Sequence, residues 1–485
     1  MAGPSDDDLP FAGVAELSAA LAGGAVTSVG LVEVLLDRIA RLDAQGTPTE
    51  LRAVLAVAPG ALDDARAADR RRAEHGASGR LHGVPVLVKD NVEVAGLPAT
   101  AGATSLAGRP ATRDAPLVGR LRREGALVLG TTNLSEWANI RDPRSSSGWS
   151  AVGGLTGNPW ALDRSAGGSS SGSGAAVAAG LAPLAVGTET DGSITCPASL
   201  TGVAGIKPTV GAVPTAGVVP ISASQDSPGP MGRTAADVAV MLEVLAATSG
   251  LADRAAEGVR GLRIGVARSY ATGHPATDDV AEQAYSRLAA AGARLVDIDL
   301  PVAPSDVREA ELTVMLAELV DGLAAYLPGR GGAGPQSLAD VIAHERAAAD
   351  VELRHFGHGL FERALELGGT ATAAYGDARR RSLAWATEAC LGPALDGLDL
   401  LVAPAYGPAW KIDLASGDGP RAGGAVTTAP AIAGWPIATA PAGLVAGLPV
   451  GVAAVGAPGS EAVLLAACAA FERPERPAWR LPQRG

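Results

Sequence analysis

The sequence predicts an α/β fold: a single large domain, residues 1–485, in which helices cover both faces of a mixed central β-sheet. Two observations predict it. Short apolar runs bounded by Gly and Pro alternate along the chain with segments of helical periodicity. The composition is 47% hydrophobic but only 3% aromatic, with 63 Gly and 34 Pro. The core is therefore built mostly from Ala, Val and Leu, and many tight turns join the elements.

The elements follow in order from the apolar spacing. Apolar residues three and four apart from Leu31 to Leu42 predict a helix, the second of a pair that begins near Val14. Further helices are expected at residues 61–72, 116–124, 175–181, 235–248, 278–291 and 460–472. Strands are expected at residues 51–57, 84–88, 126–130, 184–187, 262–267, 400–404, 437–441 and 450–455. Residues from about 305 to 395 are helical in pattern with few strand candidates, so we expect a helical insertion or cap beside the site.

Charge and cysteine content exclude several classes of protein. The net charge of −12 argues against nucleic-acid binding, which depends on basic side chains that neutralise phosphates. Cys196, Cys390 and Cys468 lie far apart without metal-ligand spacing, which favours a reduced, cytoplasmic protein with no metal and no cofactor. The acidic N-terminus does not read as a secretory signal, and no charge-free apolar run approaches about 20 residues. We therefore expect no membrane association.

Lys89 stands directly after the apolar run 84–88, at the end of a predicted buried strand. Burial disfavours the charged form of a lysine, so such a side chain can act as a neutral base. The alternative is a lysine at a strand end that simply reaches solvent.

A Gly/Ser-rich loop spans residues 167–174 and is followed at once by an Ala/Val helix pattern. It lacks the Gly-Lys-Ser/Thr ending of a phosphate-binding loop. Residues 168–172 formally match Gly-x-Ser-x-Gly, the nucleophile elbow centred on Ser170, but a turn precedes them in place of a buried strand. The immediate helix pattern also argues against a flexible linker.

Asp191-Gly192-Ser193 follows the predicted strand 184–187. A tight turn at this point would align successive backbone N–H groups, which can stabilise an oxyanion. Gly192 permits close approach and unusual dihedral angles. The alternative is an ordinary turn at the exit of a strand.

Four segments occur in a fixed order: Gly83-Val84-Pro85-x-x-Val88-Lys89-Asp90-Asn91, Gly167-Gly168-Ser169-Ser170-x-Gly172-Ser173, Gly187-Thr188-x-Thr190-x-Gly192-Ser193-Ile194 and Gly202-x-x-Gly205-Ile206-Lys207-Pro208-Thr209. Together they resemble the amidase signature family of serine hydrolases. Supporting matches are residues 131–137, Asp226-x-x-Gly229-Pro230-Met231 and residues 447–451. The resemblance covers residues 14–472, and it implies that 1–485 is one amidase signature domain.

The resemblance implies a relay of three side chains. Ser193 matches the nucleophile that attacks the amide carbonyl, and Lys89 matches the base. Ser169 matches the bridging serine, which follows a cis peptide bond in this family, so the Gly168–Ser169 bond is the candidate. Lys89 then accepts a proton from Ser169, which accepts one from Ser193. An acyl-enzyme forms, ammonia or an amine leaves, and water releases the acid.

Two further sets of groups complete the implied site. The backbone N–H groups of Thr190, Asp191, Gly192 and Ser193 match the oxyanion hole. Ser170 lies beside the relay, where we expect it to hydrogen-bond rather than react. The substrate pocket is expected around residues 137–150 and 305–395.

Departures from the commoner family pattern narrow the substrate. Thr195 stands where malonamidase-like members have an arginine that meets a substrate carboxylate, so a small dianionic substrate is disfavoured. Residues 135–139, 145–150 and 189–193 look most like the peptide amidase subgroup, which removes the amide from peptide C-termini. We interpret Cys196 as a packing thiol and not as a second nucleophile.

The sequence therefore predicts an amidase that converts a carboxylic amide, of a small molecule or a peptide C-terminus, to acid and ammonia or amine. We expect a monomer or homodimer. Three alternatives stay open: the amidase subunit of a glutamyl-tRNA amidotransferase complex, a non-catalytic amidase-like scaffold, and a histidine-dependent α/β-hydrolase centred on Ser170.

Overall fold

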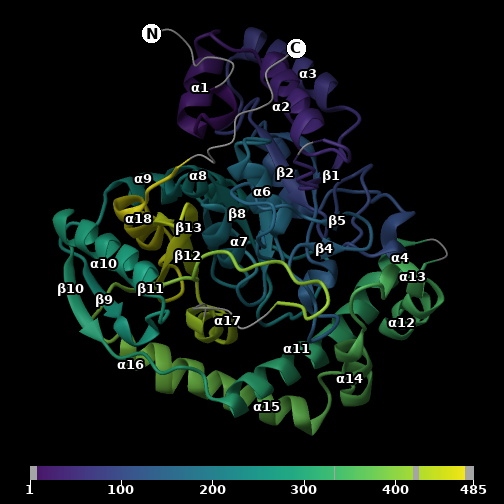
Figure 1. The fold of residues 1–485 in the computed structure, drawn as a ribbon. Coiled ribbons are helices and arrows are strands. Elements are labelled where there is room, and N and C mark those ends of the chain that lie inside the picture. The colour runs from purple at the N-terminus through teal and green to yellow at the C-terminus, as the bar shows by residue number, and fades with distance from the viewer. Residues whose placement is uncertain (1–7, 48, 332–333, 419–424, 476–485) are drawn as a thin grey trace.

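The centre of the molecule is a mixed sheet of 11 strands, seen in a computed structural model that describes residues 8–47, 49–331, 334–418 and 425–475 (Figure 1). The strand order is β1-β3-β2-β6-β8-β7-β12-β13-β11-β9-β10. Strand β2 is parallel to both of its neighbours, β3 and β6, and β9 is parallel to both of its neighbours, β11 and β10. All the other neighbouring pairs in this order are antiparallel. The strands are β1 Val54–Val57, β2 Pro85–Lys89, β3 Leu127–Thr132, β6 Leu184–Glu189, β7 Ala204–Lys207, β8 Ser227–Gly232, β9 Arg263–Ala267, β10 Arg294–Ile298, β11 Leu400–Pro404, β12 Ile437–Val445 and β13 Leu448–Val455, with a separate pair β4 Trp149–Ser150 and β5 Gly154–Leu155.

Helices flank this sheet and connect its strands. The α-helices are α1 Val14–Ala22, α2 Ser28–Leu42, α3 Ala61–His75, α4 Thr104–Ala107, α5 Pro116–Arg123, α6 Ser171–Ala178, α7 Thr195–Thr201, α8 Ala235–Ala246, α9 Leu251–Ala256, α10 Pro275–Ala290, α11 Ser305–Tyr326, α12 Leu338–Ala347, α13 Ala349–Glu352, α14 Gly359–Leu367, α15 Ala373–Ala384, α16 Gly392–Ala394, α17 Thr428–Ala433 and α18 Glu461–Phe471. Short 3-10 turns are η1 Leu9–Phe11, η2 Glu136–Asn139, η3 Arg268–Tyr270, η4 Leu327–Arg330 and η6 Ala425–Thr427, and η5 Trp385–Leu391 is a π-helical turn.

Both faces of the sheet are covered, as strand β11 shows. Leu400 and Val402 belong to the apolar cluster that includes Leu464 of α18, whereas Leu401 belongs to a second cluster with Leu200 of α7. Successive side chains of a strand point to opposite faces, so both faces of β11 are buried against helices. This confirms the predicted α/β fold with a mixed sheet flanked by helices.

A third apolar cluster, the cap cluster, lies outside the sheet. It joins Leu316, Leu319 and Leu323 of α11 with Phe361 of α14 and Trp137 of η2. Figure 1 shows α11, α14 and α15 along the lower side of the molecule, with α12 and α13 next to α4. Within residues 305–331 and 334–394, the helices α11–α16 lie where the sequence pattern predicts helices.

Several element predictions need correction. Strands β7, β8 and β10 were not expected, and α6 begins at Ser171, before the predicted residue 175. Strand β8 reads Ser-Pro-Gly-Pro-Met-Gly, a composition with low β-propensity, yet it pairs with β6 along its whole length. Gly229 explains part of this, because a Cβ there would lie 2.0 Å from the Ile206 carbonyl oxygen. Close approach of two backbones, and not local propensity, decides this strand.

The helices among the described residues include none with the length and apolar character needed to cross a membrane.

Candidate active site

Lys89 is the last residue of β2, and its side chain is fully buried. Its Nζ lies 2.7 Å from Ser169 Oγ, 2.9 Å from Thr188 Oγ1 and 3.2 Å from the Thr188 carbonyl oxygen. Burial lowers the pKa of Lys89 to about 7, against smaller opposing effects of Asp226 and Glu189. The neutral amine is therefore populated near neutral pH, where it can accept a proton from the Ser169 hydroxyl.

The Gly/Ser-rich loop turns Ser169 toward this lysine. The Gly168–Ser169 peptide bond is cis, at the position that the family resemblance implies. A Cβ on Gly168 would lie 2.2 Å from Ser135 Oγ, so only glycine fits between the two loops. Ser169 is completely buried, and its carbonyl oxygen accepts the N–H of Ser135 at 3.0 Å.

Ser193 lies in the turn between β6 and α7, with about 9% of its surface exposed. The N–H of Ser170 donates to the Ser193 carbonyl oxygen at 3.0 Å, which joins this turn to the Gly/Ser-rich loop. Ser170 Oγ bonds to the backbone of Thr188, as donor to its carbonyl oxygen at 3.1 Å and as acceptor from its N–H at 3.2 Å. Within the described residues, no hydrogen bond joins the hydroxyls of Ser193 and Ser169. The structure therefore unites Lys89 with Ser169, and it brings Ser193 beside them through the backbone.

The turn 190–194 offers backbone donors near Ser193. The N–H groups of Thr190, Gly192 and Ser193 make no hydrogen bond to any group in the part of the chain that the structure describes. Gly192 has φ +82°, and a Cβ there would lie 2.6 Å from Tyr406 Oη. The carboxylate of Asp191 accepts the Thr428 hydroxyl at 3.2 Å. Available N–H groups this close together in one turn suit the binding of an oxyanion.

The buried carboxylate of Glu189 accepts hydrogen bonds from the end of this turn. Glu189 Oε2 accepts the N–H groups of Ile194 at 2.6 Å and Thr195 at 2.8 Å, and the Thr195 hydroxyl at 3.1 Å. Burial raises the pKa of Glu189, while these N–H donors and buried Lys207 lower it. A carboxylate at the start of α7 is favourably placed for the positive end of the helix dipole.

Sequence reasoning gave no role to Thr188, Asn91 or Asp226, although all three stand inside the matching segments. Thr188 Oγ1 receives both Lys89 Nζ and Asn91 Nδ2, the latter at 3.0 Å. Asp226 accepts the Thr190 hydroxyl at 2.7 Å, and burial raises its pKa to about 6. Their positions inside the matching segments were the only signal in the sequence that these three residues have a role. Their contacts could not be predicted, because they depend on how β2, β6 and the segment before β8 come together.

A small apolar pocket adjoins Asn91 and is formed by the two regions expected to line the substrate site. Trp137 and Ala138 belong to the first region, and Leu319 of α11 belongs to the second. Trp137, Ala138 and Asn139 adopt φ of 47°, 50° and 76°, a left-handed turn that non-glycine residues seldom form. Phe361 packs edge-on against Trp137, with ring centroids 5.6 Å apart. The cap cluster thus fixes the shape of this pocket.

Three buried carboxylates beside that turn could in principle hold a cation: Glu136, Glu345 and Glu352 offer oxygen atoms within 4.8 Å of one another. The fully buried guanidinium of Arg141 already contacts Glu136 and lies 3.5 Å from Glu352. Burial raises the pKa of Glu136 and raises that of Glu345 to about 8. Arg141 is thus a positive charge placed directly against two of these carboxylates, and we call the four residues the Arg141 cluster.

The histidines bond elsewhere. His344 contacts Thr104, His358 contacts Glu345, His82 contacts the Ala68 carbonyl oxygen and His274 contacts Thr277. His355 packs edge-on against Trp149, and His75 lies beside Glu74. Among the described residues, no histidine hydrogen-bonds to Ser169, Ser170 or Ser193, which leaves the histidine-dependent reading without geometric support.

Comparisons with known proteins show which family this chain resembles as a whole. The sequence model of the family described as Amidase matches residues 30–465. The solved structure of the native peptide amidase from Stenotrophomonas maltophilia is similar, at 41% identity and a TM-score of 0.89, over 97% of this chain and 100% of that one. A bacterial aryl acylamidase of the amidase signature enzymes has 26% identity and a TM-score of 0.75, over 95% of this chain and 96% of that one. One subunit of the glutamyl-tRNA(Gln) amidotransferase of Chloroflexus aurantiacus is 36% identical, over 95% of this chain and 96% of that protein.

Proposed function

The chain belongs to the amidase family of hydrolases, and from this premise we propose that it hydrolyses the C-terminal amide of peptides through an acyl-enzyme on Ser193. The single observation that carries the mechanism is the buried Lys89, whose Nζ lies 2.7 Å from Ser169 Oγ and whose pKa is lowered to about 7. A lysine in this state can serve a serine as base in the absence of a histidine.

The first half of the proposed reaction forms the acyl-enzyme. Ser193 Oγ attacks the amide carbonyl carbon while its proton passes to Ser169 Oγ and the Ser169 proton passes to Lys89 Nζ. The carbonyl oxygen becomes an oxyanion, which the N–H groups of Thr190, Asp191, Gly192 and Ser193 stabilise. The C–N bond then breaks, the proton returns through Ser169 to the leaving nitrogen, and ammonia departs.

The second half releases the acid. Water attacks the ester carbon, and its proton follows the same route through Ser169 to Lys89. When the tetrahedral intermediate collapses, the C–O bond to Ser193 breaks and Ser193 Oγ regains a proton. Ser170 keeps its bonds to the Thr188 backbone throughout, so its role is to hold the loop and not to react.

The choice of peptide amides rests on similarity and on the charge around the turn. Peptide amidase matches at 41% identity with nearly complete coverage of both chains. Thr195 hydrogen-bonds to Glu189, so no cation stands at this position to receive a substrate carboxylate. Both points favour an uncharged amide over a dianionic one.

The amidotransferase component is the second candidate, because one subunit of that enzyme is 36% identical over nearly the whole chain. The purified chain should be assayed alone for ammonia release from N-acylated amino-acid amides, peptide amides, aryl amides and glutamine. Hydrolysis of peptide amides by the chain alone supports our proposal. Activity on glutamine that appears only with added partner subunits would support the amidotransferase, and inactivity on every amide would support a scaffold.

We further propose that α11–α16 act as a cap over the substrate. Gln225 Nε2 donates to Glu311 of α11 at 3.0 Å, and the Ser222 hydroxyl donates to Glu318 of the same helix at 2.5 Å. These bonds tie the cap to the segment that also holds Asp226, next to the oxyanion turn. We also propose a cytoplasmic location, which the three free and buried cysteines support, and we expect a monomer or homodimer.

A further inference from the structure

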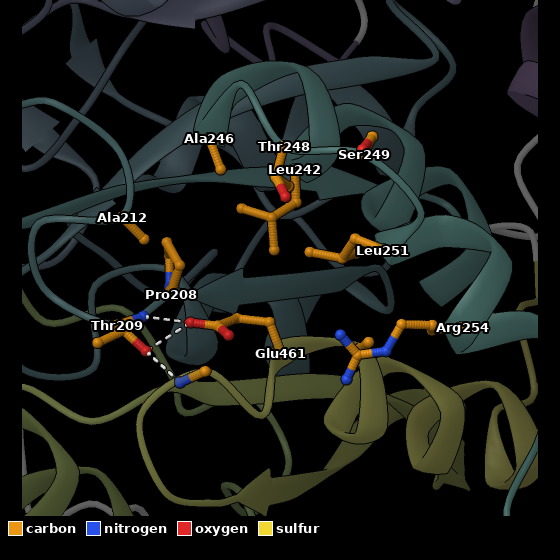
Figure 2. Close-up of a pocket in the computed structure, with 12 residues that line it drawn as sticks. Pro208, Thr209, Ala212, Leu242, Ala246, Thr248, Ser249, Leu251, Arg254 and Glu461 are labelled. Atoms are coloured by element: carbon orange, nitrogen blue, oxygen red, sulfur yellow. Dashed lines mark hydrogen bonds between the residues drawn. The ribbon is translucent and has the colours of Figure 1, made fainter.

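A second pocket lies apart from the catalytic residues, between α8, α9, α18 and the loop after β7 (Figure 2). Its volume is about 440 Å³, toward the small end of the range for ligand sites. Leu242, Ala246 and Leu251 give it an apolar wall, and Arg254 and Glu461 bring opposite charges to it. The pocket contains none of Lys89, Ser169 or Ser193, so it does not belong to the site described above.

Glu461 has one carboxylate oxygen that is free of hydrogen bonds to the described residues. Its Oε1 accepts the backbone N–H of Thr209 at 2.9 Å and also the Thr209 hydroxyl (Figure 2). These two bonds engage Oε1 and leave Oε2 available. Buried Lys207 is near enough for Glu461 to influence its pKa, but Lys207 Nζ donates to the Trp435 carbonyl oxygen at 2.7 Å.

Arg254 supplies the positive charge. Its side chain is exposed at the pocket, and no carboxylate of the described residues forms an ion pair with its guanidinium, Glu461 included. Guanidinium binds carboxylate through two parallel N–H···O bonds, which gives geometric specificity. The pocket therefore holds a cation and an anion that face the same space without neutralising each other directly.

We propose that this pocket binds a free α-amino acid with an aliphatic or aromatic side chain. The carboxylate of the ligand pairs with Arg254, its ammonium group pairs with Glu461 Oε2, and its side chain packs against Leu242 and Leu251. A simple carboxylic acid would meet Glu461 without an ammonium group, and a simple amine would meet Arg254 without a carboxylate. Only a zwitterion satisfies both charges.

The test is isothermal titration calorimetry of the full chain with three matched probes. These are L-leucine, 4-methylpentanoate, which lacks the ammonium group, and 3-methylbutylamine, which lacks the carboxylate. L-Leucine is expected to bind, and each of the other two at least about tenfold more weakly, the equivalent of one lost ion pair. Absence of heat with L-leucine at about 10 mM, where a site with a millimolar Kd would be mostly filled, would overturn the proposal.

Two variants locate the binding. Arg254→Gln removes an exposed charge from the pocket and should weaken L-leucine binding by about tenfold or more. Arg260→Gln, the matched control, alters an exposed arginine outside the pocket and should leave the Kd unchanged. Ala246→Phe should abolish binding by filling the cavity. L-Leucine that bound Arg254→Gln and Ala246→Phe as it binds the wild type would occupy another site, and the proposal would be wrong.

Discussion

Glu189 Oε2 lies 2.8 Å from the backbone nitrogen of Thr195, so a buried carboxylate closes the turn that carries Ser193. The neighbouring N–H of Ile194 shares the same oxygen at 2.6 Å. Glu189 thereby fixes the end of the turn at Ile194 and Thr195, next to the available N–H groups of Gly192 and Ser193. The pKa effects show that Glu189 also favours the charged form of Lys89.

Two substitutions of Glu189 separate the effect of its hydrogen bonds from the effect of its charge. Glu189→Ala should lower kcat by about 100-fold, because the turn loses the acceptor that orients its donors. Glu189→Gln should retain much of the rate, since its amide oxygen can still accept both N–H groups. Both variants lose the negative charge that raises the pKa of Lys89, so the apparent pKa of kcat/KM should lie below that of the wild type. Equal kcat values for Glu189→Ala and the wild type would contradict this role.

Substitution of Ser193 tests the nucleophile. Ser193→Ala should lose amide hydrolysis by several orders of magnitude, because no covalent intermediate can form. The fold should persist, since the hydrogen bond from Ser170 to this residue uses the Ser193 backbone. A fluorophosphonate probe should label Ser193 in the wild type, as mapped by mass spectrometry. Label on Ser170 would instead favour the histidine-dependent α/β-hydrolase with Ser170 as its nucleophile.

The charge state of Lys89 should set the pH dependence. Below its pKa of about 7 the ammonium cannot accept a proton, so kcat/KM should rise as pH increases through that value and then reach a plateau. Lys89→Arg should abolish activity across about pH 5 to 9, because guanidinium stays protonated there. A Lys89→Arg variant with a rate near wild type would mean that the lysine is not the base.

The Arg141 cluster predicts a stability effect. Arg141→Met should reduce the free energy of unfolding by about 3–5 kcal/mol, because it leaves buried carboxylates without their cation. The raised pKa values of Glu136 and Glu345 mean that the folded state binds protons more tightly than the unfolded state. The stability of the variant should therefore fall as pH rises from about 5 to 8.

Urea unfolding at several pH values provides the measurement. Arg144→Met is the matched control, because Arg144 is largely exposed and should change stability by less than about 0.5 kcal/mol. If both variants unfolded alike, the cluster would have no special role in stability.

Much of the architecture followed from local pattern, and the exceptions have physical reasons. Lys89 was expected at the end of a buried strand, and β2 ends at that residue. Strand β8 was not predicted, because Pro228 and Pro230 have low β-propensity and only the pairing with β6 makes this segment a strand. The Thr190–Asp226 bond joins residues 36 positions apart. Such contacts depend on the topology of the sheet, which periodicity along the chain does not specify.

The separation of the cap cluster from the sheet has a consequence for how this protein can change. Trp137, Leu319 and Phe361 pack with one another, whereas Ser169 and Ser193 stand on loops anchored to β2 and β6. A substitution at Leu319 or Phe361 therefore acts first on the packing of the cap cluster, while Lys89 and Ser169 are held by their own hydrogen bond. Under the proposed cap role, α11 and α14 are the place to begin a directed search for altered selectivity, whereas Ser222 and Gln225, which bond α11 to the segment holding Asp226, should be left unchanged.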